Sequence, residues 1–305
     1  MSDHRHDLLF GSFVTPSAAD VEAVMDHVAR AEQAGLDLVT FQDHPYQPAY
    51  LDTWTLLAFA AARTERIRLS GNVLSLPLRP PAVLARAAAS LDIMSGGRLE
   101  LGLGAGAFWD GIAAMGGRLL GPAAGVDALR EAIAIIRDLW DTERTGIVRH
   151  EGPHHPVVGA KRGPRPAHDI GIWVGAYKPR MLELTGAVAD GWLPSLEYLE
   201  RGVDSLSEMN ARIDDAAAAA GRSPNDVRRL LNVLGPALGG PPGGLLQGPA
   251  EQWIDQLTEL AVVHGVSAFI IGGDDPALSE RFAAEIAPEV RARVRREREG
   301  TVATA

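Results

Sequence analysis

Short apolar segments alternate with longer amphipathic segments along most of this chain. The apolar segments are nearly continuous, which is typical of strands that are buried on both faces of a parallel sheet. The longer segments repeat apolar residues at helical spacing and end near glycine or proline. The predicted strands are Leu8–Val14, Leu36–Phe41, Ile67–Leu76, Arg98–Gly106, Ile170–Gly175, Asp190–Leu193, Val227–Gly235 and Val266–Gly273.

Helices are predicted between these strands. Eight strands that alternate with helices predict a single α/β domain, a (β/α)8 TIM barrel spanning residues 1–305. A doubly wound sheet is the alternative, but no GxGxxG motif follows the first strand. The predicted helices are Ala18–Ala34, Trp54–Glu65, Ala82–Met94, Asp127–Trp140, a segment that begins at Pro179, Ser205–Ala220, Glu251–His264 and Pro276–Arg298.

The alternation is interrupted between strands four and five by an irregular excursion over residues 107–168. Residues 108–125 are glycine-rich, the helical pattern returns only at Val126, and residues 147–166 carry turn residues that predict a hairpin or loop. Residues 236–249 are too rich in glycine and proline for regular structure. The last helix is expected to fray into a charged tail over residues 291–305.

Composition narrows the functional class. The 305 residues contain no cysteine, which excludes disulfides, thiolate nucleophiles and cysteine-ligated metals. The formal charge of -10 argues against a general nucleic-acid partner, which would require a basic face. No apolar run approaches the ~20 residues that span a bilayer, and the polar start MSDHRHD does not resemble a signal peptide. We expect a cytoplasmic protein with no membrane partner.

Asp43 and His44 are the strongest candidates for catalysis. They follow the second predicted strand, and the carboxyl ends of barrel strands are where active sites form. A histidine can move a proton near neutral pH, and a neighbouring carboxylate can set its tautomer. A helix-capping Asp beside a surface His is the alternative interpretation.

Glycines and one asparagine mark strands three and four. Gly71-Asn72 interrupts strand three and predicts a bulge or a close backbone approach. Gly102, Gly104 and Gly106 alternate at the end of strand four, where they leave room for a flat ligand or form a tight turn.

A second candidate site follows strand five. Gly175 and Ala176 are small, and Lys178-Pro179 opens a helix whose free N–H groups attract anions. A proline in a first helical turn beside a solvated lysine is the alternative. His150, His154 and His155 do not have the spacing of a helical metal motif, so we expect a solvated loop and no metal.

These motifs resemble the bacterial luciferase-like superfamily of flavin- and deazaflavin-dependent oxidoreductases. The matching segments are FQDH, TERIRLSGNVL, RPPAVLARAAASLDIMSGGRLELGLGAG and WVGAYKPRMLELTGAVADGWLPS, with a weaker match at GVSAFIIGG. The resemblance implies a luciferase-like (β/α)8 barrel with an isoalloxazine-type ring in its mouth. It also implies a non-proline cis peptide at or beside Asn72-Val73, pressed against one face of the ring.

The resemblance also implies the cofactor contacts and a histidine, His44, beside the reactive carbon of the ring. The Asp-His pair at 43–44 looks most like the branch that uses the deazaflavin coenzyme F-420, with FMN as the alternative cofactor. The implied contacts are Asn72, Val73 and Ser75 at the bulge, Gly104, Ala105 and Gly106 along the ring edge, and Gly175, Ala176, Tyr177 and Lys178 around the phosphate.

One departure from the family pattern bears on the substrate. Sugar-phosphate dehydrogenases of the deazaflavin branch carry an acidic residue after the glycine run, where this chain has Ala107-Phe108-Trp109. The resemblance therefore implies hydride transfer between coenzyme F-420 and a small, rather apolar organic substrate. An FMNH2-dependent monooxygenase that uses oxygen, and a non-catalytic flavin-binding protein, are the alternatives.

A homodimer is the expected assembly. The alanine-rich faces of Trp54–Arg63 and Val83–Ser90 allow close helix packing between subunits, and the resemblance points the same way. The alternative is that these alanines pack against the barrel strands, as outer helices of this fold must.

Overall fold

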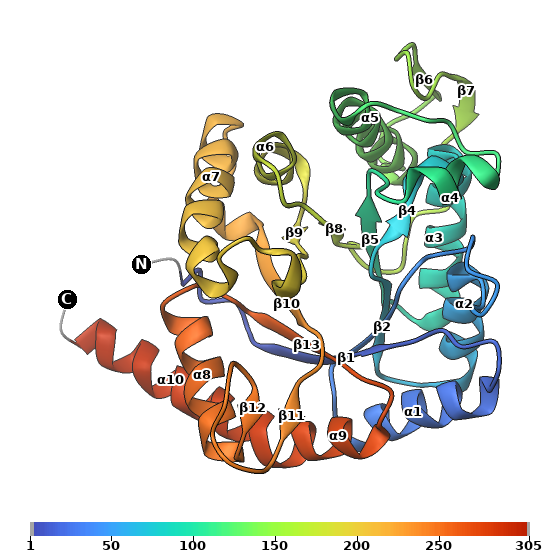
Figure 1. Ribbon diagram of the computed structural model, residues 1–305. Helices are drawn as coiled ribbons and strands as arrows, with labels where there is room; N and C mark the ends of the chain where they lie inside the picture. The colour runs from blue at the N-terminus through green and yellow to red at the C-terminus, as the bar shows by residue number, and fades with distance from the viewer. Residues whose placement is uncertain (1–2, 304–305) are drawn as a thin grey trace.

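The computed structural model describes residues 3–303, and within them a sheet of nine strand segments closes into a barrel surrounded by helices (Figure 1). All pairings around the barrel are parallel, and β3 pairs with β5 to close the ring. Two of the nine segments, β3 and β4, are halves of one strand, so the barrel has eight strand positions. The predicted (β/α)8 fold is confirmed.

The elements follow one another in the predicted order. In the first half they are β1 (Leu9–Val14), α1 (Val21–Ala34), β2 (Leu38–Phe41), α2 (Thr53–Arg63), β3 (Arg68–Gly71), β4 (Leu74–Ser75), α3 (Pro81–Ser95), β5 (Leu99–Gly104), α4 (Trp109–Ala114) and α5 (Pro122–Trp140). In the second half they are β6 (Ile147–His150), β7 (Val157–Lys161), β8 (Ile172–Val174), α6 (Pro179–Val188), β9 (Gly191–Trp192), α7 (Leu206–Ala219), β10 (Arg228–Val233), β11 (Ala237–Leu238), β12 (Gln247–Gly248), α8 (Ala250–Val262), β13 (Ala268–Gly272), α9 (Pro276–Arg281) and α10 (Ala287–Ala303).

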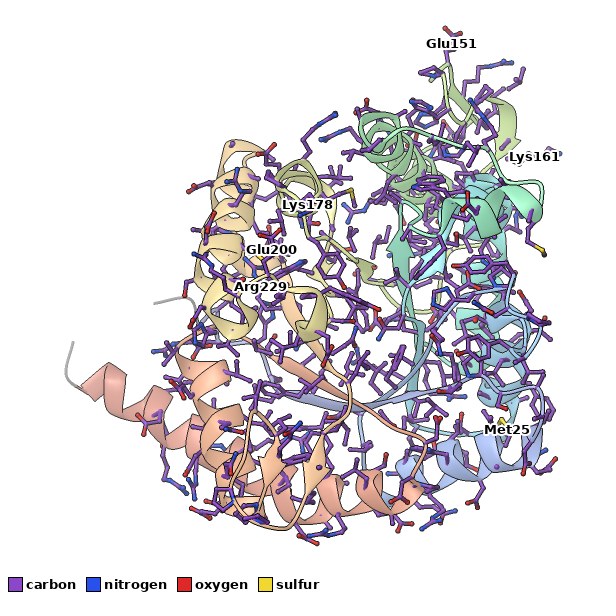
Figure 2. All side chains as sticks on the ribbon, in the orientation of Figure 1. Met25, Glu151, Lys161, Lys178, Glu200 and Arg229 are labelled. Atoms are coloured by element: carbon purple, nitrogen blue, oxygen red, sulfur yellow. The ribbon has the colours of Figure 1, made fainter. Side chains whose placement is uncertain are left out.

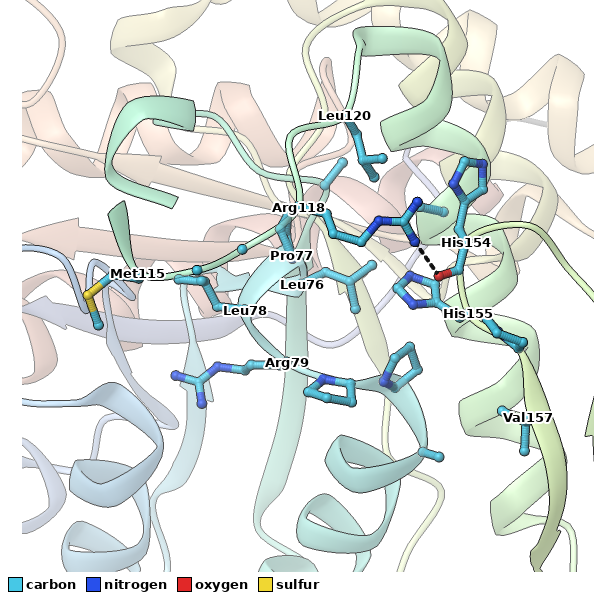
Figure 3. Close-up of a pocket in the computed structure, with 18 residues that line it drawn as sticks. Leu76, Pro77, Leu78, Arg79, Met115, Arg118, Leu120, His154, His155 and Val157 are labelled. Carbon is cyan, nitrogen blue, oxygen red and sulfur yellow. Dashed lines mark hydrogen bonds between the residues drawn. The ribbon is translucent and has the colours of Figure 1, made fainter. Parts of the chain in front are cut away.

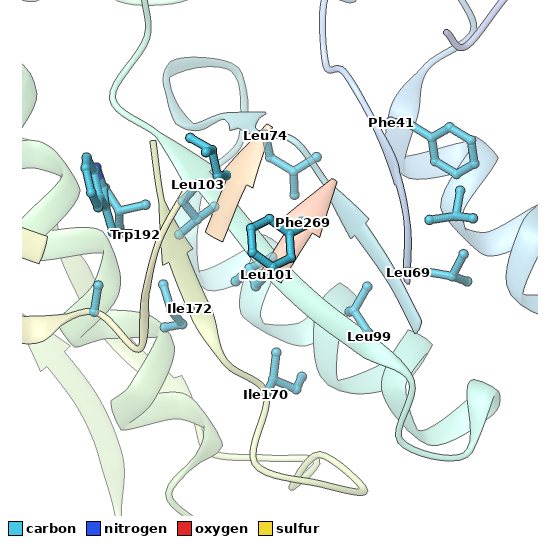
Figure 4. Close-up of a cluster of buried hydrophobic side chains, with 14 of the residues drawn as sticks. Phe41, Leu69, Leu74, Leu99, Leu101, Leu103, Ile170, Ile172, Trp192 and Phe269 are labelled. Atoms are coloured by element: carbon cyan, nitrogen blue, oxygen red, sulfur yellow. The ribbon is translucent and has the colours of Figure 1, made fainter. Parts of the chain in front are cut away.

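Successive strand residues alternate between two apolar layers, because side chains of a strand point to opposite faces. Outward residues such as Leu69, Leu101 and Phe269 join the large core between strands and helices (Figure 4). Inward residues such as Leu38 and Trp173 form a smaller cluster inside the barrel. Each fully buried large apolar side chain contributes roughly 1.5–3 kcal/mol, so both layers hold the barrel closed.

The excursion contains more helix than the sequence predicts. Helix α4 lies within the glycine-rich segment, and α5 begins at Pro122, before the predicted start at Val126. Ile112 of α4 is buried, so tertiary packing supports a helix that local composition does not favour. Strands β6 and β7 form the antiparallel hairpin that residues 147–166 indicate.

Two further segments differ from the prediction. Residues 237–248 form a small parallel pair, β11 and β12, anchored by the fully buried Leu246. The C-terminal segment is helical to Ala303 rather than frayed from residue 291, because Val290 and Val294 are buried and Arg291 pairs with Asp37. A π-helical turn over residues 282–286 divides this last helix into α9 and α10. Residues 1–2 and 304–305, the ends of the expected domain and tail, lie outside the described residues.

None of the helices within residues 3–303 is both long enough and apolar enough to cross a bilayer.

A buried histidine joins β1, α1 and α9. The His27 ring is 2% exposed, and its Nε2 lies 2.8 Å from Ser279 Oγ and 3.1 Å from Ser12 Oγ. Burial lowers the pKa of His27 below its usual 6.5, which the charges of Asp274 and other carboxylates only partly oppose. The folded protein therefore binds this proton less readily than the unfolded chain does.

We predict that stability falls as the pH drops below about 6.5 and that His27 causes part of the fall. In that range His27 of the unfolded chain is protonated before His27 of the folded protein. Each unit by which the folded-state pKa lies below the unfolded-state pKa lowers the free energy of unfolding by about 1.4 kcal/mol once the pH is below both values. Urea unfolding at several pH values should give a smaller pH slope for His27→Gln than for the wild type. Identical slopes would show that His27 does not contribute.

Candidate functional site

The third barrel strand is interrupted at its carboxyl end by a bulge. The peptide bond between Asn72 and Val73, which separates β3 from β4, is cis, as the resemblance implies. Both residues are partly exposed, in contrast to the buried Gly71 and Leu74 on either side. The bulge therefore presents Asn72 and Val73 at the barrel mouth.

Glycines on neighbouring strands make room for this bulge. A methyl group on Gly104 would lie 2.7 Å from Val73 Cγ2, and one on Gly175 would lie 3.3 Å from the same atom. A methyl group on Gly102 would lie 2.0 Å from the carbonyl oxygen of Gly71. The sequence left ligand binding and turn formation open for the strand-four glycines. The structure shows a further reason for Gly102 and Gly104, which is the space taken by the bulge itself.

A pair of asparagine amides holds the bulge from across the barrel. Asn72 Nδ2 donates to Asn232 Oδ1 at 2.8 Å, and Asn232 Nδ2 donates back to Asn72 Oδ1 at 3.0 Å. Asn72 Nδ2 also lies 3.1 Å from Thr40 Oγ1, and Asn232 Nδ2 lies 3.1 Å from Ser195 Oγ. Asn232 is not among the predicted site residues. Its only signal in the sequence is an amide at the end of an otherwise apolar strand.

Asp43 bonds away from His44. Its buried carboxylate accepts hydrogen bonds from the backbone N–H of Ser75 at 2.8 Å and from Arg79 Nη2 at 2.8 Å. Among the described residues it makes no hydrogen bond to His44. In this structure Asp43 therefore ties the loop after β2 to β4 and does not set the tautomer of His44.

His44 lies in an aromatic environment. Its Nδ1 is 2.6 Å from the hydroxyl of Tyr46, and its ring meets Phe108 edge-on with centroids 5.1 Å apart. Burial lowers the pKa of His44, and the nearby charge of Asp43 opposes this only in part, so the imidazole is neutral at pH 7. Its Nε2 makes no hydrogen bond within residues 3–303 and is the ring nitrogen left to act on a ligand.

Ser75 and Gly106 also lie near the bulge. Ser75 Oγ is buried and has no hydrogen-bond partner within the described chain, so a bound ligand would satisfy it. Gly106 has a φ of +100°, a conformation that favours glycine, in the turn that follows β5.

The predicted phosphate segment lies at the start of α6. Lys178 is 74% exposed, and its Nζ pairs with Glu200 Oε1 at 2.9 Å on the surface (Figure 2). Tyr177 uses its hydroxyl to accept the backbone N–H of Ser195, and Ala176 is buried. The backbone N–H of Gly175 donates to the carbonyl of Leu103, so the N-terminus of α6 is the part of this segment left to attract an anion, while the lysine side chain is engaged elsewhere.

Two cavities open among the loops at this end of the barrel. One of about 740 Å³ is lined by residues after β1, β2, β10 and β13, including Phe13, Gln42, Leu234 and Leu278. The other, of about 470 Å³, lies between the start of α3, the loop after α4 and the hairpin, and includes Ala105 (Figure 3). Both are lined mainly by apolar side chains. The described residues contain no cluster of three or more His, Asp or Glu side chains suited to a metal ion.

The sequence model of the luciferase-like monooxygenase family matches residues 8–234. This chain belongs to that family. Its curated relatives include an F420-dependent glucose-6-phosphate dehydrogenase of Kribbella flavida, 32% identical over 217 residues, which cover 69% of this chain and 63% of the relative. A phthiodiolone/phenolphthiodiolone dimycocerosates ketoreductase of Mycobacterium kansasii is 31% identical over 273 residues, covering 87% of this chain and 65% of the relative. The chain thus spans slightly less than two thirds of either relative's length.

Solved structures of this luciferase-like fold agree with the barrel. An F420-dependent secondary alcohol dehydrogenase, in complex with an F420-acetone adduct, superposes with a TM-score of 0.81 at 17% identity. The superposition covers 93% of this chain and 99% of that one. At this identity the likeness concerns the fold alone.

We predict that Asn232→Ala destabilises the protein by about 1–3 kcal/mol. The variant removes two hydrogen bonds of the partly buried Asn72 amide, the one its Nδ2 donates and the one its Oδ1 accepts, and leaves only the bond to Thr40. Chemical denaturation should show the loss. Ser195→Ala is the matched control, since it removes one bond of Asn232 and none of Asn72, and it should cost less. Equal losses in the two variants would contradict the assignment.

Proposed function

We propose that this protein is an oxidoreductase that transfers a hydride between coenzyme F-420 and a small apolar substrate bearing a carbonyl or alcohol group. The observation that carries the proposal is His44, a half-buried, neutral imidazole with one ring nitrogen unengaged. It follows β2, the strand that pairs with β3 as far as Gly71, just before the Asn72-Val73 bulge. Such a group can donate a proton to, or accept one from, a substrate oxygen.

The residues at the barrel mouth fit a deazaflavin. The bulge offers the partly exposed Val73 as a surface for one ring face, and the buried hydroxyl of Ser75 lacks a partner. The start of α6, just after Gly175 and Ala176, would hold the phosphate. When bound, the cofactor supplies or accepts the hydride, while the protein orients the ring and excludes water. The names of the Kribbella relative and of the solved alcohol dehydrogenase support F-420 over FMN.

The apolar surroundings favour an apolar substrate over a sugar phosphate. Phe108 packs on His44 in the segment where sugar-phosphate enzymes of the family carry an acidic residue. The ketoreductase and alcohol dehydrogenase among the similar proteins are consistent with a carbonyl substrate.

Titration of the ligand-free protein with coenzyme F-420 and with FMN tests the cofactor. We expect saturable binding of F-420 in the micromolar range and weaker binding of FMN, followed by fluorescence. With reduced F-420 bound, an aliphatic ketone should be reduced. With oxidised F-420 bound, glucose 6-phosphate should not reduce the cofactor. Micromolar affinity for FMN with none for F-420 would support the monooxygenase alternative. Binding of F-420 without turnover of any carbonyl or alcohol would support a non-catalytic role.

We also propose a homodimer formed through α2 and α3. These outer helices expose Phe59, Val83, Ile93 and Met94. Most alanines of the predicted faces, Ala60, Ala61, Ala85, Ala88 and Ala89, are instead buried within the chain, so the exposed apolar side chains carry the proposal. Light scattering at micromolar concentration should report about twice the chain mass of 32.4 kDa. A species of the single-chain mass at all concentrations would refute the dimer.

A further inference from the structure

Tyr46 is the hydrogen-bond partner of His44 in the described chain. The 2.6 Å distance from its hydroxyl to Nδ1 is at the short end of the range for hydrogen bonds. The two residues are separated only by Pro45, and the loop that carries them turns back so that the rings lie 5.5 Å apart. No family motif quoted for this chain includes Tyr46.

The excursion holds Tyr46 in place. A methyl group on Gly111 of α4 would lie 2.7 Å from the Tyr46 ring, so the helix backbone packs closely on that ring. Phe108, which immediately precedes α4, lies 6.1 Å from Tyr46 and 5.1 Å from His44 between ring centroids. The helix missed by sequence analysis therefore orders the pair from outside the barrel.

The protonation states of the two groups allow the phenol to be the donor. Burial raises the pKa of Tyr46 and lowers that of His44, so at neutral pH the phenol is protonated and the imidazole is neutral. Asp43 is the charged group near both, and its charge raises both pKa values, but its carboxylate is neutralised by Arg79. A protonated phenol can donate to Nδ1 of a neutral imidazole, and in that arrangement the ring proton lies on Nε2.

We propose that Tyr46 fixes His44 in the Nε2–H tautomer and replaces the proton that His44 delivers. The need arises because a neutral imidazole that gives up its only N–H proton would become an unstable anion. If Nδ1 takes the Tyr46 proton as Nε2 releases its own, the ring stays neutral. The negative charge then resides on the phenolate. When solvent protonates Nε2, Nδ1 returns its proton to the phenolate and the Nε2–H tautomer is restored.

The proton transfer from Tyr46 to His44, called the relay below, rests on the proposed function and completes its proton balance. The carbonyl carbon receives a hydride, the carbonyl oxygen receives the proton from Nε2, and a secondary alcohol forms. Two bonds break on the protein, N–H at Nε2 and O–H at Tyr46, and one forms, N–H at Nδ1. In the oxidative direction the same protons move in reverse. The tautomer itself requires neither cofactor nor substrate.

Tautomer measurement by nitrogen NMR tests the first part independently of activity. Long-range proton–nitrogen spectra of the labelled wild type, with His44 assigned from a His44→Gln variant, should show Nε2 protonated and Nδ1 as an acceptor. Tyr46→Phe keeps the ring packing on Gly111 but removes the hydroxyl, so the Nδ1 resonance should shift and both tautomers should appear. A protonated Nδ1 in the wild type, or unchanged His44 resonances in Tyr46→Phe, would overturn the proposal.

Tyr50→Phe is the matched control. The Tyr50 ring lies 6.5 Å from that of His44, and its hydroxyl makes no hydrogen bond among the described residues. This variant should leave the His44 resonances unchanged. If it reproduced the effect of Tyr46→Phe, general packing rather than the hydrogen bond would be responsible and the proposal would fail.

Single-turnover rates test the relay. Tyr46→Phe should slow the reaction by at least ~10-fold and leave cofactor affinity unchanged. A general acid–base residue contributes ~100-fold or more, and the loss in this variant should be smaller than that. Its pH profile should also lose the dependence on the phenol, while Tyr50→Phe retains both the rate and the profile. An unchanged rate in Tyr46→Phe would overturn the relay. Absence of F-420 turnover in the wild type would instead refute the proposed function and leave the NMR result intact.

Discussion

The packing of Val73 against glycine governs the carboxyl end of this barrel. The third strand can break and turn its chain into the mouth only because Gly104 and Gly175 have no side chain at the points where Val73 lies. Gly102 does the same for the backbone just before the break. Protein interiors are close-packed, so the bulge and the missing side chains form one complementary unit. The Asn72–Asn232 amide pair then ties this unit to the opposite wall.

The polar groups around the barrel mouth have two different roles, one structural and one suited to proton exchange. Asp43, Arg79 and Ser75 form a buried network that positions the loop after β2, whereas His44 keeps one nitrogen free and stays neutral because apolar rings surround it. The same desolvation that lowers the pKa of a histidine strengthens the hydrogen bonds it makes. An imidazole in this setting suits proton exchange with a neutral oxygen better than attraction of an anion. These properties support the proposed reduction or oxidation of an uncharged group.

The sequence predicts the order of the barrel elements well, because buried parallel strands and amphipathic helices leave strong periodic signals. It also places His44 and the Asn72-Val73 bulge, since both lie at strand ends. The partners of these residues could not be predicted from the sequence. Asn232 lies 160 positions from Asn72, Arg79 lies 36 from Asp43, and Tyr46 depends on the shape of a loop. Helix α4 has no local signal, because its stability comes from Ile112 and from the fit of Gly111 on Tyr46.

The fit between Val73 and its glycines also constrains how this sequence can change. A larger side chain at position 104 is sterically excluded while valine occupies position 73, since the two would overlap within van der Waals distance. The side-chain volumes at positions 73, 104 and 175 therefore depend on one another. A larger residue at position 104 requires that a smaller residue has first replaced Val73. In an engineered or diverging lineage these positions would vary together or not at all. The shape of the barrel mouth therefore depends on this group of residues together and not on any one of them alone.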